Sequence, residues 1–285
     1  METAKKIPAI IRSLFGNRKR LTSIIGIILI VAIVFFTKDA SYGAYLKYVR
    51  SHDNELKIGF VTDIHAGNKA SKEKGSGLIY PMHFRENMTS ALDDMRNDDY
   101  IVTLGDNLDV EKGCQKYIDE LHKMTKNFDV LWTKGNHDKD ACFPSLESRG
   151  NYYSVDVKDW RLVVLDNSSW YTDEERASNG SQNRIGSIDA GQMAWLKDSL
   201  KTDKKILIAI HVPIWDDNGN GNYSMRTDYL DLKKMLEDSG NVKYVLSGHY
   251  HNDDWKHEEN GITYYILPSI EQEGSEGYHM TLKLE

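Results

Sequence analysis

The stretch Lys57-Ile58-Gly59-Phe60-Val61-Thr62-Asp63-Ile64-His65 decides how the rest of the chain is interpreted. It is a short apolar run, typical of a β-strand, that ends in two side chains able to bind a metal ion. Alternate residues of an extended chain point to the same face, so we expect Asp63 and His65 to converge on one ion at the end of this strand. An exposed loop that carries an Asp and a His by chance is the alternative interpretation.

Recurrence of this pattern favours the metal site. Four further apolar runs each end in Asp, Asn or His beside a Gly or a Pro, and glycine lets a backbone turn sharply at such a point. Ligands bind outside the carboxyl ends of strands in open α/β sheets, so we expect the polar side chains to meet at one edge. The segments that follow the runs are Gly105-Asp106-Asn107-Leu108-Asp109, Gly135-Asn136-His137-Asp138, His211-Val212-Pro213 and Gly248-His249-Tyr250-His251.

The candidate ligands are oxygen and nitrogen donors without sulfur, which favours divalent manganese, iron or zinc over Cu(I). Seven donors are too many for a single four-coordinate ion. They suit two ions that share a bridging carboxylate and leave positions open to solvent. The seven are Asp63, His65, Asp106, Asn136, His211, His249 and His251.

In their order and spacing, these five motifs resemble the signature of the calcineurin-like metallophosphoesterases, and the resemblance covers residues 57–284. It implies an αββα sandwich, in which two packed mixed β-sheets are flanked by helices. It further implies that one ion is held by Asp63, His65 and His251. The resemblance assigns the second ion to Asn136, His211 and His249, with Asp106 as the bridging ligand.

The resemblance also implies a reaction. A metal-bound hydroxide would attack the phosphorus of a phosphomonoester or phosphodiester, His137 would act as the general acid, and Asp109 would orient His137. A histidine with a carboxylate partner keeps one tautomer and is protonated more readily, which suits this role. The alternative is a catalytically silent, membrane-anchored binding module, which is disfavoured because no ligand position has been lost.

Two departures narrow the comparison within that family. Val110-Glu111 follows the second motif where protein Ser/Thr phosphatases have Arg-Gly, so that subgroup is not expected. Asp109 stands where purple acid phosphatases have a tyrosine, and those enzymes lack the first histidine. A charge-transfer site between iron and tyrosine is therefore not expected.

Periodicity predicts an α/β layered structure. Strands alternate with helices through the first half, and residues 152–157 and 161–165 read as a hairpin. The five consecutive apolar residues 206–210 predict a strand that is buried on both faces. Helices are expected over residues 81–96, 117–124, 188–200 and 227–236.

The first 56 residues differ in character from the remainder. Residues 1–20 form a basic tail, residues 21–36 are almost wholly apolar, and residues 37–56 read as a stalk before the metallophosphoesterase domain, residues 57–285. By the positive-inside rule we expect residues 21–36 to be a transmembrane signal-anchor with the domain on the extracytoplasmic side. A cleaved signal peptide, with small residues in Ser41-Tyr42-Gly43, is the alternative. A buried soluble helix is disfavoured because the run is apolar on every face.

Charge and cysteine content constrain the partners. The net charge of −7 argues against nucleic acid, whose phosphates require clustered Lys and Arg. The expected partners are therefore a phosphate-ester substrate and, through the N-terminal helix, a membrane. Cys114 and Cys142 suit an exported protein, in which a disulfide is permitted, and a pair of partly buried free thiols is the open alternative.

Overall fold

A computed structural model describes residues 55–67, 83–110, 112–170, 185–214, 227–251, 254–272 and 276–285. All of them belong to one compact unit, Glu55–Glu285. The expected anchor, residues 21–36, and nearly all of the expected stalk lie outside the described residues. Within the described ranges, no helix combines the length and the apolar character that a membrane crossing requires.

The smaller of the two main sheets contains four strands in the order β14-β1-β3-β5. Strands β1, β3 and β5 run parallel, so their carboxyl ends lie at one edge, whereas β14 is antiparallel to β1. The bounds of these strands are Leu56–Val61 for β1, Tyr100–Thr103 for β3, Val130–Trp132 for β5 and Met280–Leu284 for β14.

The larger sheet contains six strands in the order β12-β13-β11-β10-β7-β6. Its four central strands are parallel, and each outer strand is antiparallel to its neighbour. The bounds are Tyr153–Val157 for β6, Trp160–Val164 for β7, Lys205–Ala209 for β10, Val242–Ser247 for β11, Trp255–Glu259 for β12 and Ile262–Ile266 for β13.

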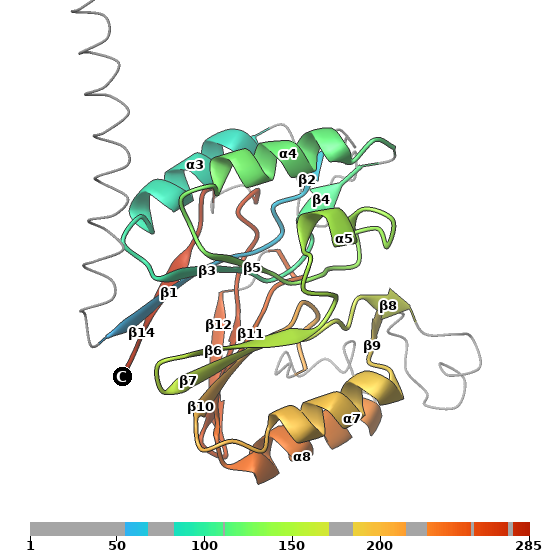
Figure 1. Ribbon diagram of the computed structural model, residues 1–285, viewed down its shortest axis with the longest axis vertical. Coiled ribbons are helices and arrows are strands. Elements are labelled where there is room, and N and C mark those ends of the chain that lie inside the picture. The colour runs from blue at the N-terminus through green and yellow to red at the C-terminus, as the bar shows by residue number, and fades with distance from the viewer. Residues whose placement is uncertain are drawn as a thin grey trace, which may run out of the picture. The chain divides into compact units, whose positions relative to one another are not determined.

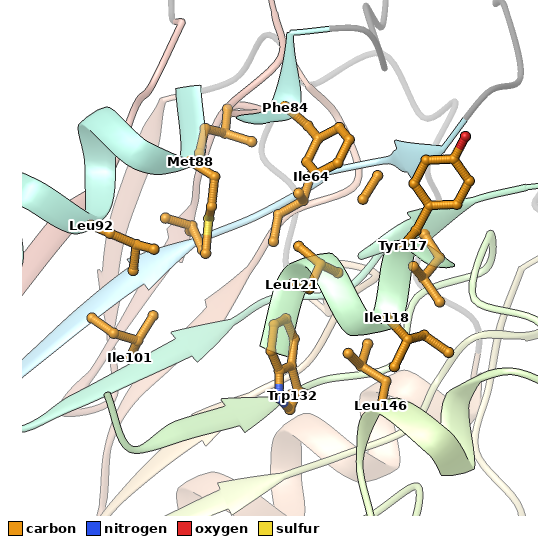
Figure 2. Packing of buried hydrophobic residues seen from close by; sticks show 14 of the residues in the cluster. Ile64, Phe84, Met88, Leu92, Ile101, Tyr117, Ile118, Leu121, Trp132 and Leu146 are labelled. Atoms are coloured by element: carbon orange, nitrogen blue, oxygen red, sulfur yellow. The ribbon is translucent and has the colours of Figure 1, made fainter. Parts of the chain in front are cut away.

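Helices cover the outer face of each sheet, as Figure 1 shows. The helices α3, α4 and α5 pack on the four-stranded sheet, where their apolar side chains form the cluster in Figure 2. The helices α7 and α8 pack on the six-stranded sheet. The bounds are Phe84–Asp94 for α3, Gln115–Met124 for α4, Phe143–Leu146 for α5, Ala190–Ser199 for α7 and Thr227–Ser239 for α8.

A second apolar cluster fills the space between the sheets. It joins Ile58 and Phe60 of β1 to Leu207 and Ala209 of β10. The alternate side chains of β10 face the helices α7 and α8 instead. Strand β10 is therefore buried on both faces, as the apolar run 206–210 predicts, and mixed sheets flanked by helices confirm the α/β class.

Some short elements escape prediction from the sequence. Strand β12 lies at a sheet edge and is rich in charged residues, so it lacks the apolar pattern of a buried strand. Two small pairs also form, β2 (Ala66–Gly67) with β4 (Leu108–Asp109), and β8 (Ser169–Trp170) with β9 (Ile185–Ser187). Strands of two or three residues are too short to show a period. Asp189 caps the start of helix α7, because its side chain accepts a hydrogen bond from the Gln192 N–H at 2.9 Å.

Cys114 and Cys142 form a disulfide, which settles the alternative left open by the sequence. Each cysteine occupies the position just before a helix, α4 and α5 respectively. Cys114 follows Asp109 by five residues and Cys142 follows Asp138 by four. The bond therefore ties the segment after the second motif to the segment after the third.

We expect the loss of this bond to destabilise the domain. The variants Cys114→Ser and Cys142→Ser should each lower the free energy of unfolding by about 2–4 kcal/mol, because the unfolded chain regains the entropy of an open loop. Urea unfolding of both variants and of the double variant would measure this. The double variant should resemble either single one, and a clearly larger loss in it would mean that the side chains contribute separately rather than through one bond.

Candidate metal centre

The carboxyl ends of five parallel strands from both sheets meet at one place. Strands β1, β3 and β5 come from the smaller sheet, and β10 and β11 from the larger. Backbone hydrogen bonds join the segments that follow them: the Asp63 N–H donates to the Gly105 carbonyl at 3.1 Å, and the Gly248 N–H to the His211 carbonyl at 3.0 Å. In addition, the His249 N–H donates to Asp63 Oδ2 at 3.0 Å and the His137 N–H to Asp106 Oδ1 at 2.7 Å. Hydrogen bonds thus join all five motifs.

Asp63 and His65 converge as expected, but not through the alternation of an extended strand. Both have left-handed backbone conformations, with φ of 52° and 46°. This turn leaves Asp63 Oδ1 and His65 Nε2 3.7 Å apart. Ile64 between them is fully buried beside Phe84 and Met88 of α3 (Figure 2), so the apolar core holds the turn in place.

Left-handed backbone recurs at the other motifs. Such a conformation costs a non-glycine residue about 1 kcal/mol or more, and it persists where the surrounding structure enforces it. Clustering of this kind is typical of functional sites. The candidate ligands with positive φ are Asp63, His65, Asp106, His249 and His251.

Glycine precedes three of the motif residues for two different reasons. Gly105 has a φ of 96°, as expected for a sharp turn. Gly135 and Gly248 lack a positive φ and instead permit close approach. A Cβ on Gly135 would lie 2.1 Å from the Asp106 backbone nitrogen, and one on Gly248 would lie 1.9 Å from Thr62 Oγ1. These two glycines let the motifs touch.

Four candidate ligands form a first group, Asp63, His65, Asp106 and His251, whose ligand atoms all lie within 4.8 Å of one another. His251 Nε2 lies 3.1 Å from Asp63 Oδ1 and 3.4 Å from His65 Nε2. His65 Nε2 lies 3.8 Å from Asp106 Oδ2. The second carboxylate oxygen of Asp63 is held by the Thr62 hydroxyl and the His249 N–H, at 2.6 and 3.0 Å.

A second group shares Asp106 with the first and adds His211 and His249. His211 Nε2 lies 3.3 Å from Asp106 Oδ2 and 3.1 Å from Asn136 Oδ1. Its other ring nitrogen, Nδ1, lies 2.7 Å from the Leu104 carbonyl. A hydrogen bond to that carbonyl places a proton on Nδ1 and directs Nε2 toward Asp106 and Asn136.

His137 and Asp109 lie beside these groups. The His137 backbone N–H donates to Asp106 Oδ1 at 2.7 Å, and His137 Nδ1 lies 3.3 Å from Asp109 Oδ1. The His137 side chain is 30% exposed, whereas His65 and His211 are fully buried. The small pair of β2 and β4 fixes Asp109 here by placing it opposite Gly67.

The buried charges compensate one another. Burial alone would raise the pKa of Asp63, but the adjacent His251 and His65 hold it well below its usual value. Burial lowers the pKa of His211, but the charge of Asp106 outweighs this and raises the pKa to about 9. Burial and the positive His211 lower the pKa of His249 to about 4. The site therefore accommodates a limited amount of positive charge, concentrated around its two carboxylates.

These residues fit divalent cations. Asp63 Oδ1 and His65 Nδ1 are buried atoms without a hydrogen-bond partner, which is costly for polar groups. The donor set combines carboxylate oxygen, amide oxygen and imidazole nitrogen, as borderline divalent metals prefer. A cation between His211 and Asp106 would replace the proton that His211 otherwise carries.

Asp138 is a site residue to which the sequence assigned no role. Its carboxylate is buried and accepts four hydrogen bonds from N–H groups of Gly135, Asn107 and Leu108, at 2.8–3.1 Å. Burial and the charge of Asp106 raise the pKa of Asp138 to about 7, whereas the N–H donors favour its ionised form. Asp138 thus fixes the second motif against the third. The sequence signal that could have indicated this role is the position of Asp138 directly after His137 in the third motif.

Asn167 is a second buried residue that supports the site. It is fully buried, its Nδ2 donates to the Val212 carbonyl at 2.8 Å, and the Val212 N–H donates to its Oδ1 at 3.0 Å. The amide therefore pairs with the backbone next to His211 and ties the end of β7 to that of β10.

The chain matches the family model described as calcineurin-like phosphoesterase over residues 56–253. Tartrate-resistant acid phosphatase type 5 of Mus musculus and that of Rattus norvegicus are each 25% identical to it over 220 residues. The alignment covers 65% of this chain and 66% of each phosphatase, slightly less than two thirds of their length.

A solved structure, that of a dimetal phosphatase from Danio rerio, has a similar fold. It superposes with a TM-score of 0.62 at 16% sequence identity, over 76% of this chain and 88% of the other. At that level of identity the likeness concerns the fold alone.

We expect Asp138→Asn to lower the free energy of unfolding by about 1–3 kcal/mol. An amide has one acceptor oxygen, and its NH₂ group would face N–H donors whose hydrogen bonds the second carboxylate oxygen of Asp138 now accepts. Urea denaturation would measure the change. Asp238→Asn removes a carboxylate on helix α8 that is 63% exposed, so it should change stability by less than about 0.5 kcal/mol. Equal effects of the two substitutions would contradict the role given to Asp138.

Proposed function

Because the chain belongs to the calcineurin-like phosphoesterase family, we propose that it hydrolyses phosphoric esters with two divalent metal ions held between its two sheets. One observation carries the proposal. Ligand atoms from four of the five motifs form two groups that share Asp106, with the atoms of each group within 4.8 Å of one another, and Asn136 of the remaining motif lies 3.1 Å from His211 Nε2. A structural metal site would require neither the shared carboxylate nor the partly exposed histidine beside it.

In this proposal Asp63, His65 and His251 hold one ion and Asn136, His211 and His249 hold the other. Asp106 contacts both, since its Oδ2 lies 3.8 Å from His65 Nε2 and 3.3 Å from His211 Nε2. Manganese, iron and zinc all suit these donors. When bound, a pair of such ions activates water and neutralises charge on a phosphoryl group.

His137 is the proposed general acid. Its backbone is fixed by Asp106, Asp109 lies on the Nδ1 side of its ring, and its partial exposure lets substrate reach Nε2. Asp109 favours the protonated ring and orients it, so that Nε2 donates a proton to the departing oxygen. The similarity to acid phosphatases supports phosphomonoesters as substrates, with phosphodiesters as the second class to be assayed.

We also propose that residues 21–36 anchor the domain on the extracytoplasmic side of a membrane. The apolar run with basic residues before it supports this orientation. The Cys114–Cys142 disulfide adds support, because such bonds persist in oxidising compartments. Full-length protein should stay with membranes after an alkaline carbonate wash, and release of the intact chain by that wash would contradict the anchor.

The basic test is turnover of p-nitrophenyl phosphate and bis-p-nitrophenyl phosphate with manganese, iron or zinc added. We expect metal-dependent hydrolysis of at least one ester. Stoichiometric metal without turnover of either ester under any of these ions would favour a silent binding module.

Two variants separate metal binding from proton transfer. Asp106→Asn should lose both manganese binding, measured by calorimetry, and turnover, because both groups of ligands depend on this carboxylate. His137→Ala should keep its metal while turnover falls by about 10²–10⁴-fold, the usual contribution of a general acid.

His257→Ala serves as the control, since His257 is half-buried on the edge strand β12, where it stacks on Trp255, and belongs to neither group of ligands. This variant should match the unaltered protein in both measurements. A near-normal rate for Asp106→Asn would contradict the two-ion centre, and unchanged turnover for His137→Ala would remove its role as acid.

A further inference from the structure

A polar hollow of about 140 Å³ lies at the carboxyl end of β7. Its walls come from the start of β6, the end of β7 and the first turn of α7. They are firmly held, because the Gln192 side chain bonds the backbone of Asp166 twice, at 2.7 and 2.8 Å. The described residues that line it are Asn151, Tyr152, Asp166, Ser169, Asp189 and Gln192.

Two sets of contacts connect the walls of this hollow to the segments that carry the candidate metal ligands. Asp166 precedes Asn167, whose amide pairs with Val212 next to His211. Asp166 Oδ2 also lies 3.5 Å from Lys134 Nζ, and Lys134 comes two residues before Asn136. The hollow therefore lies next to the segments that carry His211 and Asn136.

The hollow and its surroundings carry an excess of negative charge. Lys134 is the cation paired with Asp140 and Asp166, at 2.6 and 3.5 Å. Among the described residues, no Lys or Arg forms an ion pair with Asp189, which also lines the hollow. The described residues that line the hollow thus include two carboxylates, Asp166 and Asp189, and no cation, which disfavours an anionic guest and favours a cationic one.

Size and an aromatic wall limit the guest further. A cavity of about 150 Å³ holds roughly one benzene ring, so this hollow has room for a small head group and not for a nucleoside. Tyr152 lines the hollow with its ring packed against Trp195, at 5.0 Å between ring centroids. Aromatic rings beside carboxylates attract ammonium groups.

We propose that the hollow binds the ammonium group of an aminoalkyl leaving group, so that the preferred substrates are phosphate esters of small amino alcohols. The proposal rests on the proposed phosphoesterase function. It assigns Asp189 and Tyr152 to the selection of the substrate and leaves the two groups of ligands to the reaction itself.

The experiment uses the full chain with manganese. We would compare kcat/KM for phosphoethanolamine, 3-aminopropyl phosphate and phosphocholine with that for glycerol phosphate, which is a neutral polyol ester, and for phosphoglycolate, which is an anionic one. Binding of phosphoethanolamine and glycerol phosphate would also be measured by calorimetry. We expect ammonium esters to be favoured over glycerol phosphate, and phosphoglycolate to be the poorest substrate.

Asp189→Asn removes the charge while keeping a good helix N-cap, because Asn and Asp cap equally well. It should lower kcat/KM and affinity for ammonium esters about two- to fivefold, the size of one partly exposed ion pair, and leave p-nitrophenyl phosphate unchanged. Asp198→Asn, a fully exposed change on the same helix, is the matched control and should alter neither.

Hydrolysis of p-nitrophenyl phosphate without a preference for ammonium esters would overturn the hollow as a selective site and leave the phosphoesterase function intact. Equal losses in Asp189→Asn and Asp198→Asn would overturn it as well. If no ester were hydrolysed, the proposed function would fail, and calorimetry would still decide the hollow: tighter binding of phosphoethanolamine than of glycerol phosphate, weakened in Asp189→Asn, would support it, and equal binding would overturn it.

Discussion

Two buried carboxylates, Asp63 and Asp106, impose the central constraint on this domain. Both are almost fully excluded from solvent, and a buried charge is costly unless opposite charge or hydrogen bonds compensate it. The motifs meet this requirement with histidines from both sheets, Thr62 and backbone N–H groups. The two sheets can bury these carboxylates at their shared edge only because the compensating groups converge there.

Apolar packing and the polar edge depend on each other. Ile64 is buried beneath α3, and this fixes the turn that carries Asp63 and His65. Asp138 joins the second motif to the third, and Asn167 joins the end of β7 to the residue after His211. The buried contacts of Ile64 and Asp138 support the left-handed backbone at Asp63, His65 and Asp106.

The features that could be predicted from the sequence are those that a local pattern of residue types determines. Apolar runs that end in Asp, Asn or His placed the strands that carry the motifs and the edge at which the candidate ligands meet. Prediction from the sequence failed where tertiary contacts decide. The turn at Asp63 and His65 is left-handed and not extended, Gly135 and Gly248 permit contact between motifs rather than a turn, and Asp138 acts through partners far away in sequence. None of these follows from local pattern, because each depends on what lies opposite.

The two ends of the strand edge differ in the chemistry that they offer. Around Asp106, histidines and carboxylates are balanced, so that added cations would displace protons rather than create new charge. Around Asp166, the described residues that line the hollow include two carboxylates and no cation, and its walls are polar side chains with an aromatic ring among them. A phosphate ester has the same asymmetry, with an anionic head and a separate substituent. Balanced charge suits the head once metal is present, and the unbalanced end suits a substituent of positive charge. The reaction is therefore assigned to strand ends of both sheets, and selection to the neighbouring end of β7.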